Sequence, residues 1–237
     1  MGSRAIKFLV ILLLQTSISG CMNEVKTVKP ELPGEEITFL SLGDSYTIGE
    51  SVAENERWPV QLADSLRGEG FRIDDPVIVA RTGWTTGELI DGIDKAGLSG
   101  PYDLVSLLIG VNNQYRGGDP EIFRKEFVEL LGISISLAGN NEGKVFVLTI
   151  PDWGVTPFAN GRDNASISRE IDVFNAIVTE ESLNAGIQCF DITDISRRAS
   201  HDTTLVARDG LHPSGEMYSQ WVERIMHDII TIISTGA

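Results

Sequence analysis

The feature that most constrains the fold is a regular alternation of short apolar runs with longer amphipathic stretches. The apolar runs are hydrophobic at nearly every position, with many Val, Ile and Leu residues. Such runs suit parallel strands that are buried on both faces of a sheet. We therefore expect strands at residues 37–42, 76–80, 104–109, 144–149 and 186–190.

The stretches between these runs have helical periodicity. We expect helices at residues 58–66, 86–95, 122–137, 166–184 and 214–233. Apolar residues at helical spacing predict the inner face of the last helix, namely Tyr218, Trp221, Val222, Ile225, Ile229 and Ile232. Alternating strands and helices imply a three-layer α/β/α sandwich with right-handed crossovers. Because there is no internal repeat and no second boundary, we expect one domain over residues 37–237.

The first twenty residues have the pattern of a secretory signal. Arg4 and Lys7 precede an unbroken apolar run at 8–14, which is too short to span a bilayer. Residues 18–21, Ile-Ser-Gly-Cys, resemble a bacterial lipobox, which implies cleavage before Cys21 and acylation of that cysteine. The alternative is a signal peptide that is cut nearby, with Cys21 incidental. Residues 21–36 contain prolines among charged residues and predict a tether, so we expect an extracytoplasmic lipoprotein that Cys21 anchors in a membrane.

Charge and cysteine content exclude several classes of protein. The 237 residues include 19 Lys and Arg against 34 Asp and Glu, a net charge of −15. Nucleic-acid binding relies on clustered Lys and Arg, so this balance argues against a nucleic-acid partner. The two cysteines rule out a disulfide-rich scaffold, and no Cys/His cluster has zinc spacing. With Cys21 acylated, Cys189 is a lone thiol near the end of the fifth expected strand.

A serine follows the first expected strand in the sequence Gly43-Asp44-Ser45-Tyr46-Thr47-Ile48-Gly49. In open parallel sheets the functional site lies at the carboxyl ends of the strands. A serine on this turn is placed to present its Oγ and its own N–H to a cleft, which makes Ser45 a candidate nucleophile. The alternative is an ordinary turn, where Gly, Asp and Ser are common.

One histidine is placed to act as a base for Ser45. His212 lies in Asp209-Gly210-Leu211-His212-Pro213, directly before the last helix, and the spacing lets the Asp209 carboxylate reach one imidazole nitrogen. The alternative is a turn-capping aspartate beside an unrelated histidine. We expect His201 to be solvated in a polar loop and His227 to flank the apolar face of the last helix.

Two further strand ends offer hydrogen-bond donors for a developing oxyanion. Gly83 follows the second strand, where the lack of a Cβ lets its backbone N–H approach a substrate, and the Asn112 amide follows the third. Nucleophile, donors and acid–base pair thus all fall at strand ends or just before the last helix.

With these residues in place, the chain resembles the SGNH or GDSL hydrolases over essentially the whole expected domain. The resemblance rests on Gly43-Asp44-Ser45, Gly83, Gly110-x-Asn112 and Asp209-x-x-His212. It implies a flavodoxin-like sheet with strand order 2-1-3-4-5 and an esterase or acylhydrolase without metal or organic cofactor. By the same resemblance Ser45 is the nucleophile, His212 the general base and then acid, and Asp209 its orienting group. The oxyanion hole would comprise the Ser45 N–H, the Gly83 N–H and the Asn112 side chain.

The chain departs from the family pattern at two positions. Tyr46 replaces the usual Leu, which we expect to affect pocket lining more than catalysis. Asn113 replaces the more common Asp, which puts local hydrogen bonding of its loop in doubt rather than activity.

The substrate is less constrained than the reaction. We expect a short acyl group, such as acetyl, on a carbohydrate or similar carrier, because an extracytoplasmic tether would place the enzyme among glycans. A lysophospholipase or thioesterase that acts on longer chains is the alternative, and a non-catalytic carbohydrate-binding lipoprotein would have lost a catalytic residue, which is not the case here. Trp84 and Trp153 are candidates to stack on a sugar ring, and Arg116 to meet an anionic group or pair with an acid. The expected pocket residues are Tyr46, Trp84, Gln114, Tyr115, Arg116 and, in the turn 151–153, Trp153.

Overall fold

The sheet of this protein has five strands that all pair in parallel. The computed structural model describes residues 36–235, so the predicted signal, Cys21 and nearly all of the predicted tether lie outside the described residues. The strands are β1 (Phe39–Gly43), β2 (Val77–Ala80), β3 (Leu104–Leu108), β4 (Val145–Leu148) and β5 (Gln188–Phe190). Their order is β2-β1-β3-β4-β5, which confirms the predicted topology.

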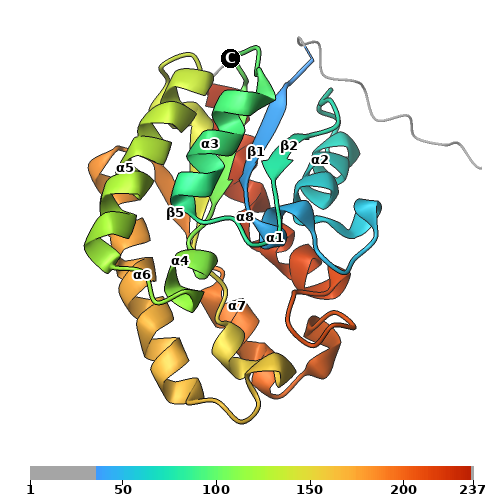
Figure 1. Cartoon of the computed structure of the whole chain (residues 1–237). Coiled ribbons are helices and arrows are strands. Elements are labelled where there is room, and N and C mark those ends of the chain that lie inside the picture. The colour runs from blue at the N-terminus through green and yellow to red at the C-terminus, as the bar shows by residue number, and fades with distance from the viewer. Residues whose placement is uncertain (1–35, 236–237) are drawn as a thin grey trace, which may run out of the picture. The chain divides into compact units, whose positions relative to one another are not determined.

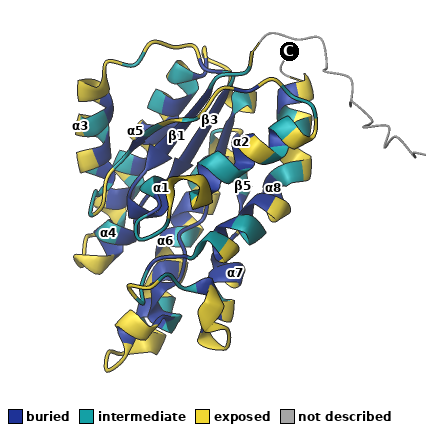
Figure 2. Ribbon diagram, turned by 90° about the vertical axis from the view of Figure 1, so that its right-hand side faces the viewer, coloured by how far each residue is buried: buried dark blue, intermediate teal, exposed yellow. Residues whose placement is uncertain are grey.

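Helices cover both faces of this sheet. On one face α2 (Trp58–Gly68) packs against α8 (Gly215–Thr235). On the other face lie α3 (Thr86–Ala96), α5 (Pro120–Leu137) and α6 (Asn164–Asn184), with α5 between the other two (Figure 1). Figure 2 shows the buried sheet between the two helical layers, which confirms the predicted α/β/α sandwich.

The predicted helices are correct in kind, and their ends differ for local reasons. Helix α5 begins two residues early because the Asp119 side chain accepts the Glu121 N–H and Pro120 suits the first turn. Helix α6 begins at Asn164 because Asp163 caps it in the same way. On α8 the inner face also includes Met217, and Ile233 rather than Ile232 is buried.

Three short helices at the carboxyl edge of the sheet were not predicted. They are α1 (Ser45–Ile48), α4 (Val111–Tyr115) and α7 (Thr193–Arg197). The described residues also form single turns of 3-10 helix, of which η2 (Glu142–Lys144) precedes β4 at the amino edge of the sheet. The others are η1 (Glu54–Glu56), η3 (Trp153–Val155), η4 (Pro157–Ala159), η5 (Arg198–Ser200) and η6 (Thr203–Leu205). Helices of four or five residues are too short to show a periodicity of 3.6, so the hydrophobic pattern carries no signal for them.

Large aromatic side chains fill the core beside β1. Phe39, Trp58 and Phe146 pack together under α2 and are fully buried. At the end of β1, a Cβ on Gly43 would overlap both the Thr47 hydroxyl and the Leu108 carbonyl oxygen. Any larger residue at position 43 would therefore displace the turn that carries Ser45.

Cys189 lies on β5 and is not in a disulfide bond. Burial raises the pKa of its thiol to about 11, although hydrogen bonds with Thr179 and Ser182 lower that pKa. The thiol is therefore protonated at neutral pH and a poor nucleophile. Among residues 36–235, no helix combines the length and the apolar character needed to cross a membrane.

Candidate active site

Ser45 is the first residue of α1, just after the carboxyl end of β1, an interior strand of the sheet. The Asp44 side chain caps this helix by accepting the Tyr46 N–H at 3.0 Å, and Gly49 ends it with a left-handed φ of 69°. Ser45 is only 5% exposed. The turn therefore holds the serine in a defined and largely desolvated position.

The carboxyl group next to Ser45 is unusual. Burial raises the pKa of Asp44 to about 7, although the hydrogen bond from the Tyr46 N–H lowers it. Its Oδ1 atom carries that bond, while its Oδ2 atom has no hydrogen-bond partner among the described residues. Asp44 is thus a structural cap whose burial favours the neutral form of its carboxyl group.

Asp209 and His212 form a short hydrogen bond at the same edge of the sheet. The His212 Nδ1 atom lies 2.6 Å from the Asp209 Oδ2 atom, so the imidazole is oriented by the carboxylate. The Asp209 Oδ1 atom accepts the N–H groups of Leu211 at 2.9 Å and His212 at 3.0 Å. Burial would raise the pKa of Asp209, but the hydrogen bonds from His212, Leu211 and Ser51 outweigh it and hold that pKa well below its usual range.

The serine segment and the histidine segment meet through Tyr46. The edge of the Tyr46 ring contacts the His212 ring, with 5.8 Å between the centroids. His212 is 8% exposed and Tyr46 is 3% exposed, so this contact is shielded from solvent. The residue that replaces the family's Leu therefore packs directly on the candidate base.

The segment after β3 is hydrogen-bonded to the loop after β2. The Asn112 amide donates to the Trp84 carbonyl at 2.9 Å, and the Arg116 guanidinium donates to the Gly83 carbonyl at 2.6 Å. Gly83 has a φ of 88°, a conformation that glycine adopts without strain. Two hydrogen bonds thus join the loop of Gly83 to the segment of Asn112. One N–H of the Asn112 amide is used in the bond to Trp84, which leaves the other for an oxyanion.

The hydrogen bonds of the Asn113 side chain explain why this chain has Asn where the family more often has Asp. Its Oδ1 atom accepts the Thr86 N–H at 3.1 Å, while its Nδ2 atom donates to the Thr86 hydroxyl at 2.7 Å. That hydroxyl in turn donates to Glu126. A carboxylate at position 113 would accept the first bond but not donate the second, so Asn suits this loop better than Asp.

Three of the expected pocket residues, Gln114, Trp153 and Trp84, make hydrogen bonds or packing contacts within the protein. Gln114 is buried, donates to Glu170 at 2.7 Å and accepts the Trp153 indole N–H at 2.8 Å. Trp153 itself is only 4% exposed, so its ring is not free to stack on a sugar. Trp84 packs on α3, where a Cβ at Gly92 would overlap its ring. Hydrogen bonds and packing already engage these three side chains, and their part in binding a substrate stays a prediction.

The exposed aromatic surface lies instead on Tyr115 and Phe158, which are 47% and 39% exposed. Together with Trp153 they form a cluster whose ring centroids are 5.3 to 6.4 Å apart. The Arg162 guanidinium lies over all three rings, at 5.0 to 5.6 Å from their centroids. The Phe158 N–H donates to the Gly210 carbonyl at 2.9 Å, which joins this aromatic cluster to the loop of Asp209 and His212. Phe158 and Arg162 lie beyond the residues that directly follow a strand, so the sequence did not single them out.

Arg116 is paired with an acid, one of its two predicted fates. Its guanidinium lies 3.2 Å from the Glu88 carboxylate, besides the bond to Gly83. His201 and His227 are both exposed, in agreement with the sequence. Within residues 36–235, no group of three or more His, Cys, Asp or Glu side chains is placed to hold a metal ion.

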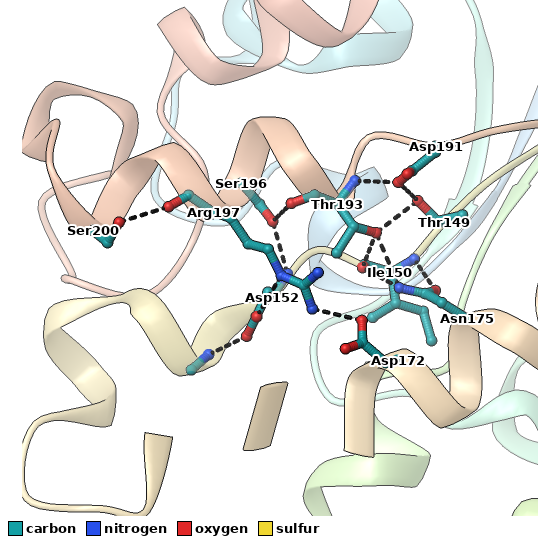
Figure 3. Close-up of polar contacts among 11 residues, drawn as sticks. Thr149, Ile150, Asp152, Asp172, Asn175, Asp191, Thr193, Ser196, Arg197 and Ser200 are labelled. Atoms are coloured by element: carbon teal, nitrogen blue, oxygen red, sulfur yellow. Dashed lines mark hydrogen bonds and ion pairs between the residues drawn. The ribbon is translucent and has the colours of Figure 1, made fainter. Parts of the chain in front are cut away.

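A polar network fixes the loop after β4, the loop that carries Trp153. Figure 3 shows the hydrogen bonds and ion pairs of this network. The Asp152 carboxylate is fully buried and is paired with the Arg197 guanidinium at 2.9 Å, and the Arg197 side chain also reaches Asp172 at 2.6 Å. The Ser196 hydroxyl accepts the Asp152 N–H at 2.8 Å. The network continues to the end of β4 through Thr149, Ile150, Asn175, Asp191 and Thr193.

We expect Arg197→Met to lower the free energy of unfolding by about 3 kcal/mol, because it leaves the buried Asp152 carboxylate without its cation. Asp172→Asn is the matched control, since it removes the exposed partner of the same guanidinium and should change stability by less than about 1 kcal/mol. Urea unfolding monitored by circular dichroism measures both variants. Equal effects would mean that the buried half of this network contributes no more than the exposed half.

A parallel α/β/α sheet with a serine at the end of β1 and an Asp–His pair before α8 is the architecture of a class of ester hydrolases. The chain belongs to the GDSL-like Lipase/Acylhydrolase family, whose model matches residues 41–220. The protein is therefore an ester hydrolase of the SGNH or GDSL type.

Solved structures of similar proteins agree with this assignment. The esterase EstA from Pseudoalteromonas sp., in a structure inhibited by monoethylphosphonate, is 20% identical, with a TM-score of 0.61 over 83% of this chain and 97% of that one. A lipase/acylhydrolase from Enterococcus faecalis is 20% identical, with a TM-score of 0.63 over 81% and 95%. The acetyl xylan esterase AlAXEase is 15% identical, with a TM-score of 0.63 over 81% and 100%. At these identities the likeness shows the common fold. Among curated proteins, none matches the chain.

Proposed function

We propose that this enzyme cleaves a carboxylic ester through an acyl-enzyme on Ser45, with His212 as the base and Asp209 as its orienting group. The observation that carries the proposal is the 2.6 Å hydrogen bond between Asp209 and His212. The segment of Ser45 lies next to this pair, because Tyr46 contacts the His212 ring. Because Nδ1 faces Asp209, the Nε2 atom is left to exchange a proton with Ser45 and the leaving group.

The proposed reaction has two halves. The His212 Nε2 atom takes the Ser45 hydroxyl proton as Oγ attacks the ester carbonyl carbon, and it returns that proton to the leaving alcohol as the C–O bond breaks. Water then attacks the acyl-enzyme, giving a proton to His212, which passes it to Ser45 as the acid leaves. In both halves the Ser45 N–H, the Gly83 N–H and the Asn112 amide would stabilise the tetrahedral oxyanion.

We expect Asn112→Ala to lower kcat by roughly 10²- to 10³-fold with little change in KM, the usual effect of losing one oxyanion donor. Steady-state kinetics with p-nitrophenyl acetate measure this. Arg116→Met serves as the control, because it loosens the same loop at Gly83 without removing the Asn112 amide. Full activity of Asn112→Ala would exclude Asn112 from the oxyanion hole.

A small cavity beside the site supports a short acyl group. The cavity measures about 10 Å³, enough for roughly one water-sized group. Tyr46 and Leu211 line it, and these residues are the chain neighbours of Ser45 and His212. Its other lining residues are Pro151, Asp152, Trp153, Thr156, Ser196, Pro213 and Met217. The cavity has room for a group of about methyl size and not for a long acyl chain, and its lining residues do not include Ser45 or His212 themselves.

The alcohol part of the proposed substrate is a carbohydrate or a similar polar carrier. The exposed rings of Tyr115 and Phe158 offer a stacking surface next to the loop of His212. The presence of an acetyl xylan esterase among the structural neighbours supports this choice of carrier. The second candidate is a lysophospholipid or thioester, since the same exposed aromatic surface offers apolar contact to a long acyl chain.

A series of p-nitrophenyl esters from acetate to decanoate, run beside a panel of acetylated oligosaccharides, tests the proposal. We expect the highest kcat/KM with acetate, and release of acetate from the oligosaccharides. Tyr115→Ala should raise KM for the oligosaccharides and not for p-nitrophenyl acetate, whereas Val128→Ala, an equally exposed apolar residue on α5, should change neither. Preference for long chains with no sugar deacetylation would favour the second candidate instead.

We propose in addition that acylation of Cys21 holds the enzyme at an extracytoplasmic membrane surface. The lipobox-like residues 18–21 behind the apolar run support this. With 34 acidic against 19 basic residues, the chain is poorly suited to electrostatic attachment to anionic lipid. Metabolic labelling with an alkyne fatty acid should therefore mark the wild type and not Cys21→Ser, and labelling of both would place the lipid elsewhere.

A further inference from the structure

The Asp209 carboxylate accepts four hydrogen bonds, two on each oxygen. Three of these come from its own loop, namely from the N–H groups of Leu211 and His212 on Oδ1 and from the His212 ring on Oδ2. The fourth comes from the Ser51 hydroxyl, which donates to Oδ2 at 2.7 Å. Ser51 stands 158 positions earlier in the chain, in the loop that follows Ser45 and α1. This bond therefore joins the segment of the candidate nucleophile to the Asp–His pair.

The backbone at Ser51 has a strained conformation that a glycine would adopt at lower cost. Its φ is 67°, in the left-handed region, which costs a non-glycine residue roughly 1 kcal/mol. Glycine would adopt this conformation without strain, as Gly49 does two residues earlier with a φ of 69°. Strained residues of this kind gather at functional sites, where the surrounding structure enforces them. The side chain that a glycine would lack is the hydroxyl that reaches Asp209.

We propose that Ser51 is a positioning residue, whose hydroxyl fixes the Asp209 carboxylate and, through it, the orientation of the His212 ring. The inference rests on the proposed role of His212 as the base. With two donors on each oxygen, the carboxylate is held against rotation, so Oδ2 keeps facing the His212 Nδ1 atom. Hydrogen bonds that hold a functional side chain in its productive geometry support activity without touching the substrate.

Two substitutions separate the hydroxyl from the backbone. Ser51→Gly removes the hydroxyl and relieves the strain at φ 67°, while Ser51→Ala removes the hydroxyl and keeps the strain. We expect Ser51→Gly to be the more stable variant in thermal unfolding, and both variants to lose kcat by the same factor of roughly 10, with KM unchanged. A role confined to turn shape predicts the opposite pattern, in which the glycine variant keeps wild-type activity and only the alanine variant is impaired.

Proton NMR supplies a readout independent of turnover. The proton in the short bond between His212 and Asp209 should give a strongly downfield resonance in the wild type, and this resonance should move or broaden equally in both Ser51 variants. Asn140→Gly is the matched control: Asn140 also has a positive φ of 62° but precedes β4, at the amino edge of the sheet. It should change neither kcat nor the resonance.

The two measurements keep this proposal distinct from the proposed function. If the wild type hydrolyses no ester, the proposed function fails, and the resonance alone decides whether Ser51 holds Asp209 and His212. If the wild type is active and Ser51→Gly keeps both full activity and an unmoved resonance, the role of Ser51 is overturned while the proposed function stands.

Discussion

Ser45→Ala is expected to reduce kcat by roughly 10⁶-fold, because the proposed acyl-enzyme then has no oxygen on which to form. His212→Ala should cause a loss of similar size, since nucleophile and base act as one unit and their effects do not add. Steady-state hydrolysis of p-nitrophenyl acetate measures both variants. The double variant should be no worse than either single one.

Covalent labelling provides the control for this prediction. A serine-reactive phosphonate should modify the wild type with one-to-one stoichiometry and leave Ser45→Ala unmodified, as intact-protein mass spectrometry will show. Circular dichroism should give the same spectrum for the wild type and for Ser45→Ala, because the Asp44 side chain, and not that of Ser45, caps α1. Labelling of the Ser45→Ala protein at another serine would disprove the assignment of the nucleophile.

Asp209→Asn is expected to lower kcat by roughly 10⁴-fold while the enzyme remains folded. The wild-type carboxylate accepts the His212 Nδ1–H and leaves Nε2 free to act as a base. An asparagine that presents its NH₂ group to Nδ1 instead favours the tautomer with the proton on Nε2, which cannot take the Ser45 proton. Because the pKa of Asp209 is held well below its usual range, the wild-type carboxylate stays ionised across the mildly acidic and neutral range.

Asp202→Asn is the matched control for this second prediction. Asp202 lies nearby in the sequence and also caps a short turn, where it accepts the Thr204 N–H at 3.0 Å, but it has no bond to His212. We expect Asp202→Asn to retain wild-type kcat. If Asp209→Asn also keeps more than about a tenth of wild-type activity, the orienting role of Asp209 would be untenable.

Much of the fold was predictable because its signals are local. The five strands appear in the sequence as short apolar runs, and the five long helices as apolar residues at helical spacing. The expected burial on both faces holds for β1, β3 and β4, whereas the edge strands β2 and β5 each bury a single residue. Errors concentrate at element ends, as at α6, where the Asp163 cap extends the helix to Asn164. The short helices α1, α4 and α7 were missed, although they carry or flank the site, because a single turn leaves no periodic trace.

The site was predictable in part, for the same reason. Ser45, Gly83 and Asn112 follow their strands directly, and Asp209 and His212 are close in sequence, so strand ends and spacing point to them. Whether a side chain is free for substrate is a different matter. Gln114 and Trp153 sit at the predicted edge, but they are hydrogen-bonded to each other and buried. No local pattern shows that a polar or aromatic side chain already has a partner in another element.

The sequence by itself determined the order of strands and helices, the edge of the sheet that carries the site, and the residues that directly follow each strand. These properties depend on hydrophobic period and chain direction, which neighbouring residues encode. Only the tertiary structure decided which loops touch. The bond from Ser51 to Asp209 and the contact of Phe158 with Gly210 join segments that are distant in sequence. Their distances are set by the packing of the whole sheet and its helices, which no single stretch of sequence specifies.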